Sequence, residues 1–175
     1  MKREQINEKL KKYIVDNILP MYSKHDPAHR LDHVLHVVTR TLKLVEIMDD
    51  KGIDLNINIA YAAAIYHDTG LMYGREDHNI NSGKIVREDK NLKEFFSDDE
   101  IELIAQACED HRASLKYEPR SIYGKIVSDA DRDGDICIMI ERSYNYYSMK
   151  NPKASAVMCA YHAFTHLGEK YGDKG

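Results

Sequence analysis

Glycine and proline, the residues that most often break helices, are scarce: the 175 residues include only nine glycines and four prolines. Alanine, leucine, glutamate and lysine are common, and these residues have high helix propensity. No segment shows the clear alternation of apolar and polar residues that is typical of a half-buried strand. The composition therefore disfavours a β-rich protein and favours an all-α protein.

Long apolar segments and a cysteine framework are also missing. The longest apolar run is about eight residues, whereas a bilayer-spanning helix needs about 20. The N-terminal residues Met1 to Ile6 become polar at once, unlike a secretory signal. The three cysteines are widely spaced, with neither a CxxC pair nor a disulfide pattern. We therefore expect a cytoplasmic protein with reduced thiols and no membrane association.

Charge of one sign does not dominate the chain. There are 25 basic and 29 acidic residues, which give a formal net charge of −4, and neither half carries a long basic block. General nucleic-acid binding depends on neutralising many phosphates, so we do not expect it here. The length suits one domain with its own hydrophobic core. The oligomeric state is not readable from the sequence.

Apolar residues recur at helical spacing along most of the chain, which predicts a single-domain helical bundle of about seven to eight helices. We expect one domain over residues 1–175, with helices 2–19 and 152–171 packed on the same core as the rest. The other expected helices cover residues 31–49, a segment that ends near Gly70, then 80–88, 98–110, 121–128 and 133–147.

The most informative feature is the pair His67–Asp68, which follows the apolar helical segment Ile59–Tyr66 directly. An imidazole and a carboxylate at the end of a buried helix are costly unless something pairs with them. A divalent cation is a suitable partner for both.

Three further chemical groups extend this pair into an ordered pattern. His33 ends the segment DPAHRLDH at residues 26–33, and Asp129 and Asp131 lie in the segment DADR at residues 129–132. The order His, His-Asp, Asp resembles the HD-domain superfamily of metal-dependent phosphohydrolases, and the resemblance spans about residues 26–147. It implies that His33, His67, Asp68 and Asp131 bind one divalent cation. Asp131 is preferred to Asp129 because the last ligand of the family usually lies in an Ala-Asp-Arg or Ala-Asp-Lys context.

The resemblance implies hydrolysis of a small phosphorylated substrate, most simply a nucleotide, by attack of metal-bound hydroxide on phosphorus. Two imidazoles and two carboxylates suit Mn, Fe, Co, Ni or Mg better than a thiolate-seeking metal. The cation lowers the pKa of bound water and polarises the phosphoryl group. Monoester, pyrophosphate and cyclic diester hydrolysis all remain open.

Supporting residues are assigned from the same resemblance. His78, His111 and Arg112 are expected at the catalytic centre, where the two histidines would bind a second metal or contact the substrate phosphate. Residues that would contact the substrate or support the ligands are His29, Asp129 and Arg132. Glu76 and Asp77 are candidates for a general acid.

Two other functions are compatible with parts of the sequence. Residues 129–141 resemble a calcium loop, but the twelfth position, which should be glutamate, is Ile140. A non-catalytic metal or nucleotide sensor is the other alternative. His162 and His166 have a metal-compatible spacing without a third ligand, so we expect two polar positions beside the core there.

Overall fold

The computed structural model describes residues 5–24, 31–112, 115–132 and 136–171. Within these ranges the chain is all-α, as predicted, with eight α-helices and no strand. None of the described helices combines the length and apolar character needed to cross a membrane. Short 3-10 helices, labelled η, connect several of the α-helices. In chain order the elements are α1 (Glu8–Asn17), η1 (Leu19–Lys24), α2 (Leu31–Asp50), α3 (Ile57–Tyr66), η3 (Thr69–Tyr73), α4 (His78–Glu88), η4 (Lys90–Glu94), α5 (Asp98–Glu109), α6 (Ile122–Asp131), α7 (Ile136–Lys150) and α8 (Ala156–Tyr171).

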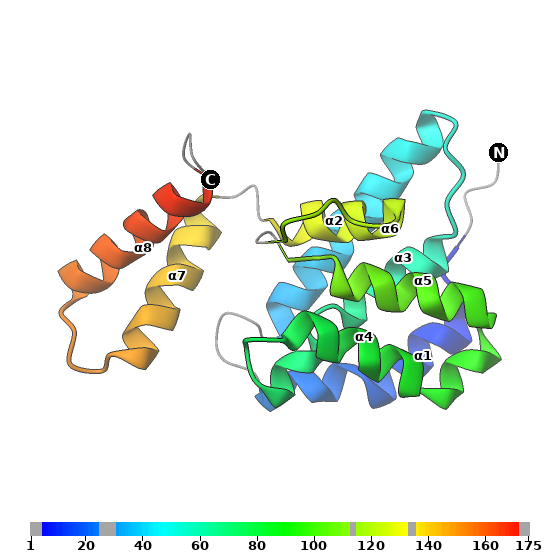
Figure 1. Cartoon of the computed structure of the whole chain (residues 1–175), viewed down its shortest axis with the longest axis horizontal. Helices are drawn as coiled ribbons and strands as arrows, with labels where there is room; N and C mark the ends of the chain where they lie inside the picture. Colours follow the sequence, from blue (N-terminus) through cyan, green and yellow to red (C-terminus); the bar gives the residue numbers. More distant parts are fainter. Residues whose placement is uncertain (1–4, 25–30, 113–114, 133–135, 172–175) are drawn as a thin grey trace.

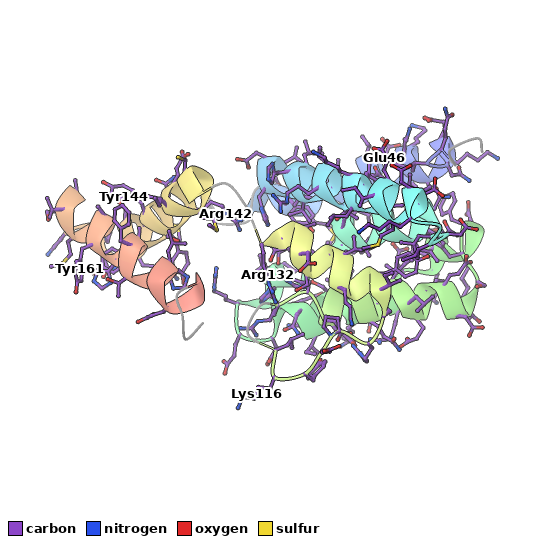
Figure 2. All side chains as sticks on the ribbon, turned by 90° about the horizontal axis from the view of Figure 1, so that it is seen from above. Glu46, Lys116, Arg132, Arg142, Tyr144 and Tyr161 are labelled. Carbon is purple, nitrogen blue, oxygen red and sulfur yellow. The ribbon has the colours of Figure 1, made fainter. Side chains whose placement is uncertain are left out.

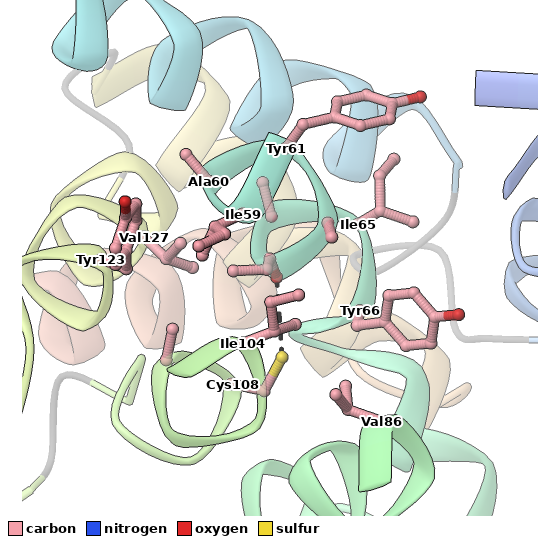
Figure 3. Close-up of a cluster of buried hydrophobic side chains, with 14 of the residues drawn as sticks. Ile59, Ala60, Tyr61, Ile65, Tyr66, Val86, Ile104, Cys108, Tyr123 and Val127 are labelled. Carbon is pink, nitrogen blue, oxygen red and sulfur yellow. Dashed lines mark hydrogen bonds between the residues drawn. The ribbon is translucent and has the colours of Figure 1, made fainter. Parts of the chain in front are cut away.

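Helix α3 is the centre of the fold. Every residue from Ile59 to Tyr66 is buried, and α2, α5 and α6 pack around the helix. A helix that is apolar on all sides is stable only inside a core. Figure 3 shows side chains of α3 facing Ile104 and Cys108 of α5 and Val127 of α6. The helix therefore brings its C-terminal end, where His67 and Asp68 follow, into the interior.

Side-chain caps set the helix starts more closely than apolar spacing predicted. The first helix begins at Glu8 rather than near residue 2, because the Asn7 side chain accepts hydrogen bonds from the Lys9 and Leu10 amides. Helix α3 is capped by Asn56, whose side chain accepts a hydrogen bond from the Asn58 amide.

Helices α7 and α8 form a hairpin at one end of the long axis (Figure 1). Buried Cys159 and Ala163 of α8 line the contact, and the Tyr147 ring of α7 stacks on His162 with centroids 3.9 Å apart. We expected residues 152–171 to pack on the common core, but α8 packs chiefly against α7. Accordingly, three large apolar side chains of α8, Val157, Tyr161 and Phe164, are more than half exposed.

Candidate metal centre

The C-terminal end of α3 is buried, so its last carbonyl groups need partners from outside the helix. Side chains supply them. His67 Nδ1 lies 2.8 Å from the Ala64 carbonyl oxygen, the Tyr22 hydroxyl donates to Ile65 at 2.5 Å, and the Thr69 hydroxyl donates to Tyr66 at 2.8 Å. The first of these bonds also fixes the orientation of the His67 ring. The contact between His67 and the Ala64 carbonyl oxygen therefore both satisfies the helix end and places a candidate ligand.

All four predicted ligands come together at this helix end. His33, in the first turn of α2, has its Nε2 3.1 Å from Asp131 Oδ1 and 3.7 Å from Asp68 Oδ2. His67 Nε2 lies 3.3 Å from Asp68 Oδ2 and 3.8 Å from Asp131 Oδ1. One ligand atom each from His33, His67 and Asp68 fits within 4.8 Å of the others, a spacing that can hold a metal ion. The structure therefore gathers residues of α2 and α6 and the two residues that follow α3 into one site.

A second group of possible ligands shares Asp68 with the first. Asp68 Oδ1 lies 3.4 Å from His78 Nε2 and 3.5 Å from His111 Nε2. His78 begins α4, His111 follows α5, and the three residues again satisfy the 4.8 Å limit. The two oxygens of one carboxylate thus face two different pairs of imidazoles.

The histidine rings are oriented alike. His78 Nδ1 lies 2.8 Å from the Arg75 carbonyl oxygen and His111 Nδ1 lies 2.6 Å from that of Cys108, the same three-residue return that His67 makes. A carbonyl can only accept, so each Nδ1 carries a proton and each Nε2 points to the centre, where its lone pair is available to a metal once that nitrogen is unprotonated. His78 Nε2 and His111 Nε2 are 3.3 Å apart, a distance at which either a shared proton or a metal ion between them relieves the repulsion of their lone pairs. The donor set therefore fits a divalent metal on either side of Asp68.

Burial and charge affect the candidate ligands differently. Burial opposes a charge on His67, but the carboxylates of Asp68 and Asp131 outweigh it and raise the pKa of His67 to about 9. Burial and the neighbouring His111 lower the pKa of His78 to about 4. Burial would raise the pKa of Asp131, but the hydrogen bond from His33 and the nearby His67 hold it well below its usual range. Without metal, a proton on His67 therefore offsets part of the carboxylate charge.

This proton predicts a pH-dependent metal affinity. Between about pH 7 and pH 9 a metal must displace the His67 proton, so the apparent affinity should rise about tenfold per pH unit. His78 is neutral throughout this range and should contribute no proton. Competition titration with a metal indicator measures the slope, and calorimetry in buffers of different ionisation enthalpy measures about one proton released per protein. An affinity that does not change with pH would contradict this assignment.

The other predicted site residues are less closely placed. Arg112 is half-buried, and its Nη1 donates to the Glu76 carbonyl at 2.6 Å, which places it on the segment that leads into His78. Asp129 and Arg132 are exposed, and the Arg40 side chain donates to the carbonyl oxygens of both, at 3.5 and 3.3 Å. His29 lies outside the described residues. Glu76 and Asp77 are exposed.

The calcium-loop alternative conflicts with the local structure where it is described. Asp129 and Asp131 lie in the last turn of α6 rather than in a loop. Asp129 is exposed, whereas Asp131 turns toward His33 and His67. Residues 133–135 of that motif lie outside the described residues.

Sequence patterns missed a carboxylate–arginine network at the end of α5, directly before His111 in the chain. Asp110 is fully buried, and Arg120 binds it through Nε and Nη2 at 3.0 and 2.8 Å. Glu109 accepts from Arg120 and from Arg87, both at 2.5 Å. The signal was present in the sequence, because Glu109, Asp110 and His111 stand at the end of a helix with a buried apolar face.

The sequence also missed Arg142, which comes from α7. Its Nη2 lies 3.4 Å from His33 Nε2. No local pattern marks this arginine, because its position depends on where the hairpin lies relative to the rest of the fold.

An all-α fold with buried histidines and carboxylates at converging helix ends defines a helical metal-site protein. Residues 30–133, more than half of the chain, match the HD domain. The chain therefore belongs to the HD-domain family, the superfamily of metal-dependent phosphohydrolases that its motifs resemble. A crystal structure of a predicted HD superfamily hydrolase from an uncultured Thermotogales bacterium has a similar fold. The TM-score is 0.55 and the sequence identity 23%, over 89% of this chain and 88% of that one. No curated protein matches the chain.

Proposed function

We propose that the protein is a metal-dependent phosphohydrolase of small phosphorylated molecules, with nucleotides as the substrate class and two divalent metals at the centre. The observation that carries this proposal is the position of Asp68. Its Oδ2 faces His33 and His67, and its Oδ1 faces His78 and His111, at 3.3 to 3.7 Å in every case. A carboxylate in this position could contribute a ligand to each of the two groups. His33, His67 and Asp131 would hold the first metal, and His78 and His111 would hold the second.

The nitrogen and oxygen donors indicate the metals that would be bound. No cysteine belongs to either ligand group, so Mn, Fe, Co, Ni or Mg suits the centre better than a metal that prefers thiolate. A divalent cation here supplies acidification of water and polarisation of phosphorus. Backbone carbonyls of the chain hold His67, His78 and His111 in the tautomer that can bind a metal. Burial excludes bulk water from His67 and His111, which are 0% and 2% exposed.

The test is a metal analysis of the purified protein joined to an activity panel. Nucleoside mono-, di- and triphosphates, a cyclic dinucleotide and p-nitrophenyl phosphate are incubated with Mn, Mg, Co or Ni after chelation. We expect hydrolysis that depends on added metal, and up to two metal ions per chain. A protein that binds metal and hydrolyses none of these compounds would support the sensor alternative and overturn the proposal.

A further inference from the structure

Helix α7 contacts the candidate metal centre through Arg142, which lies beside His33. Figure 2 shows Arg142 on the side of α7 that faces the body of the protein. Its guanidinium lies 3.4 Å from His33 Nε2, the nitrogen that would bind the first metal. Burial lowers the pKa of His33, and the hydrogen bond with Asp131 opposes this shift. The positive charge of Arg142 also lowers the pKa.

A second contact lies one helical turn further along α7. The guanidinium carbon of Arg75 is 4.7 Å from the centroid of the Tyr146 ring, within the range of a cation–π interaction. Arg75 belongs to the segment before α4, and its carbonyl oxygen is the partner of His78 Nδ1. The turn of α7 that carries Arg142 and Tyr146 therefore reaches both halves of the centre, the His33 half and the His78 half.

Metal binding would change the surroundings of Arg142. A cation bound at His33 Nε2 would occupy the nitrogen that the guanidinium faces, and the two positive charges would then repel each other. The arginine needs an anion at the same place. A phosphate oxygen bound beside the metal is such an anion, and the planar fork of arginine matches phosphate oxygens in pairs. Arg112, tied to the Glu76 carbonyl, brings another guanidinium to the segment before His78.

We propose that Arg142 is a phosphate-binding residue of the substrate site, and that the Tyr146–Arg75 contact positions α7 so that Arg142 reaches the centre. The proposal deepens the proposed function and rests on it for the identity of the substrate. It makes the C-terminal hairpin a wall of the substrate site. A merely structural arginine would instead support His33, and these two roles predict opposite effects on metal affinity.

The test measures binding of inorganic phosphate to the Mn-loaded protein by calorimetry, beside Mn affinity measured separately. Arg142→Gln should weaken phosphate binding about tenfold or more, because a charge-assisted pair is lost. Mn affinity should stay equal or increase, since a nearby positive charge is gone. Lys43→Gln is the matched control: it removes one positive charge from an exposed position on α2 and should leave both affinities unchanged.

Variants at Tyr146 test the positioning contact. Tyr146→Phe keeps the aromatic face under Arg75 and should bind phosphate like the wild type, whereas Tyr146→Ala should weaken phosphate binding several-fold without changing Mn affinity. Equal phosphate affinity in Arg142→Gln and wild type would overturn the proposal, as would a wild type that binds no phosphate. A loss of Mn affinity in Arg142→Gln would also overturn it in favour of the structural role.

These binding measurements separate the two proposals. If the wild type binds phosphate through Arg142 but hydrolyses no phosphorylated compound, the hydrolase proposal fails and the phosphate site stands. If hydrolysis is normal in Arg142→Gln with an unchanged KM, the hydrolase proposal stands and the role of Arg142 fails.

Discussion

Asp68→Ala is expected to lose metal from both positions and to reduce phosphohydrolase activity by a thousandfold or more, on the order of the loss of a central electrostatic group. Both candidate ligand groups contain Asp68, so this single change affects each of them. The metal-free protein should stay helical, because the core around α3 does not depend on this carboxylate. Metal content, activity and circular dichroism are measured on the same preparation.

A second substitution and a control test the role of Asp68 further. Asp68→Asn keeps the shape of the side chain but turns an amide NH₂ toward one histidine pair, so we expect at most one metal to remain. Asp50→Asn is the matched control: it changes an exposed aspartate at the end of α2, at the opposite end of that helix from His33, and should leave metal content and activity intact. Full activity in a metal-free Asp68→Ala protein would refute the metal-dependent scheme.

The sequence predicted the residues that meet at the centre, because their positions follow from helix ends. His67 and Asp68 follow an apolar helix that had to be buried, and His33 and Asp131 fit the order of a known family pattern. The fold places four side chains close together, those of His33, His67, Asp68 and Asp131. Their roles as metal ligands remain predictions, which the metal analysis tests. The sequence left open whether His78 and His111 bind metal, since that depends on how α4 and α5 lie beside α3.

The contributions that the sequence did not predict are those that depend on tertiary placement. Arg142 lies on a helix with a surface-like pattern, and only the position of the hairpin brings it to His33. Arg120 lies after an irregular segment, and only the path of that segment folds it over Asp110. The helix start at Asn7 was missed for a different reason, since an asparagine cap competes with nearby alternatives of similar propensity.

Gly70→Ala is expected to be the most destabilising single-methyl change in this region, because η3 and α4 touch through their backbones. A Cβ at position 70 would collide with the His78 carbonyl oxygen and would lie 2.5 Å from the Ser82 amide nitrogen. Neither atom belongs to a flexible side chain. The Gly70 amide also donates to the Ser82 hydroxyl at 2.9 Å, so α4 cannot shift away without losing that bond. We expect a loss of about 3 kcal/mol in unfolding free energy, or failure to fold.

The same collision links stability to the metal centre, because the clashing carbonyl belongs to His78 itself. Moving α4 outward to admit the methyl group would carry the His78 ring away from Asp68. A folded Gly70→Ala protein should therefore melt about 6–12 °C lower and lose its second metal more readily than its first. Gly168→Ala is the matched control, since a Cβ there meets nothing within 4 Å in helix α8, and its melting temperature should be unchanged or slightly higher. Equal melting temperatures and equal metal content in Gly70→Ala and wild type would show that η3 and α4 are not in backbone contact, and the position of His78 beside Asp68 would then have no support.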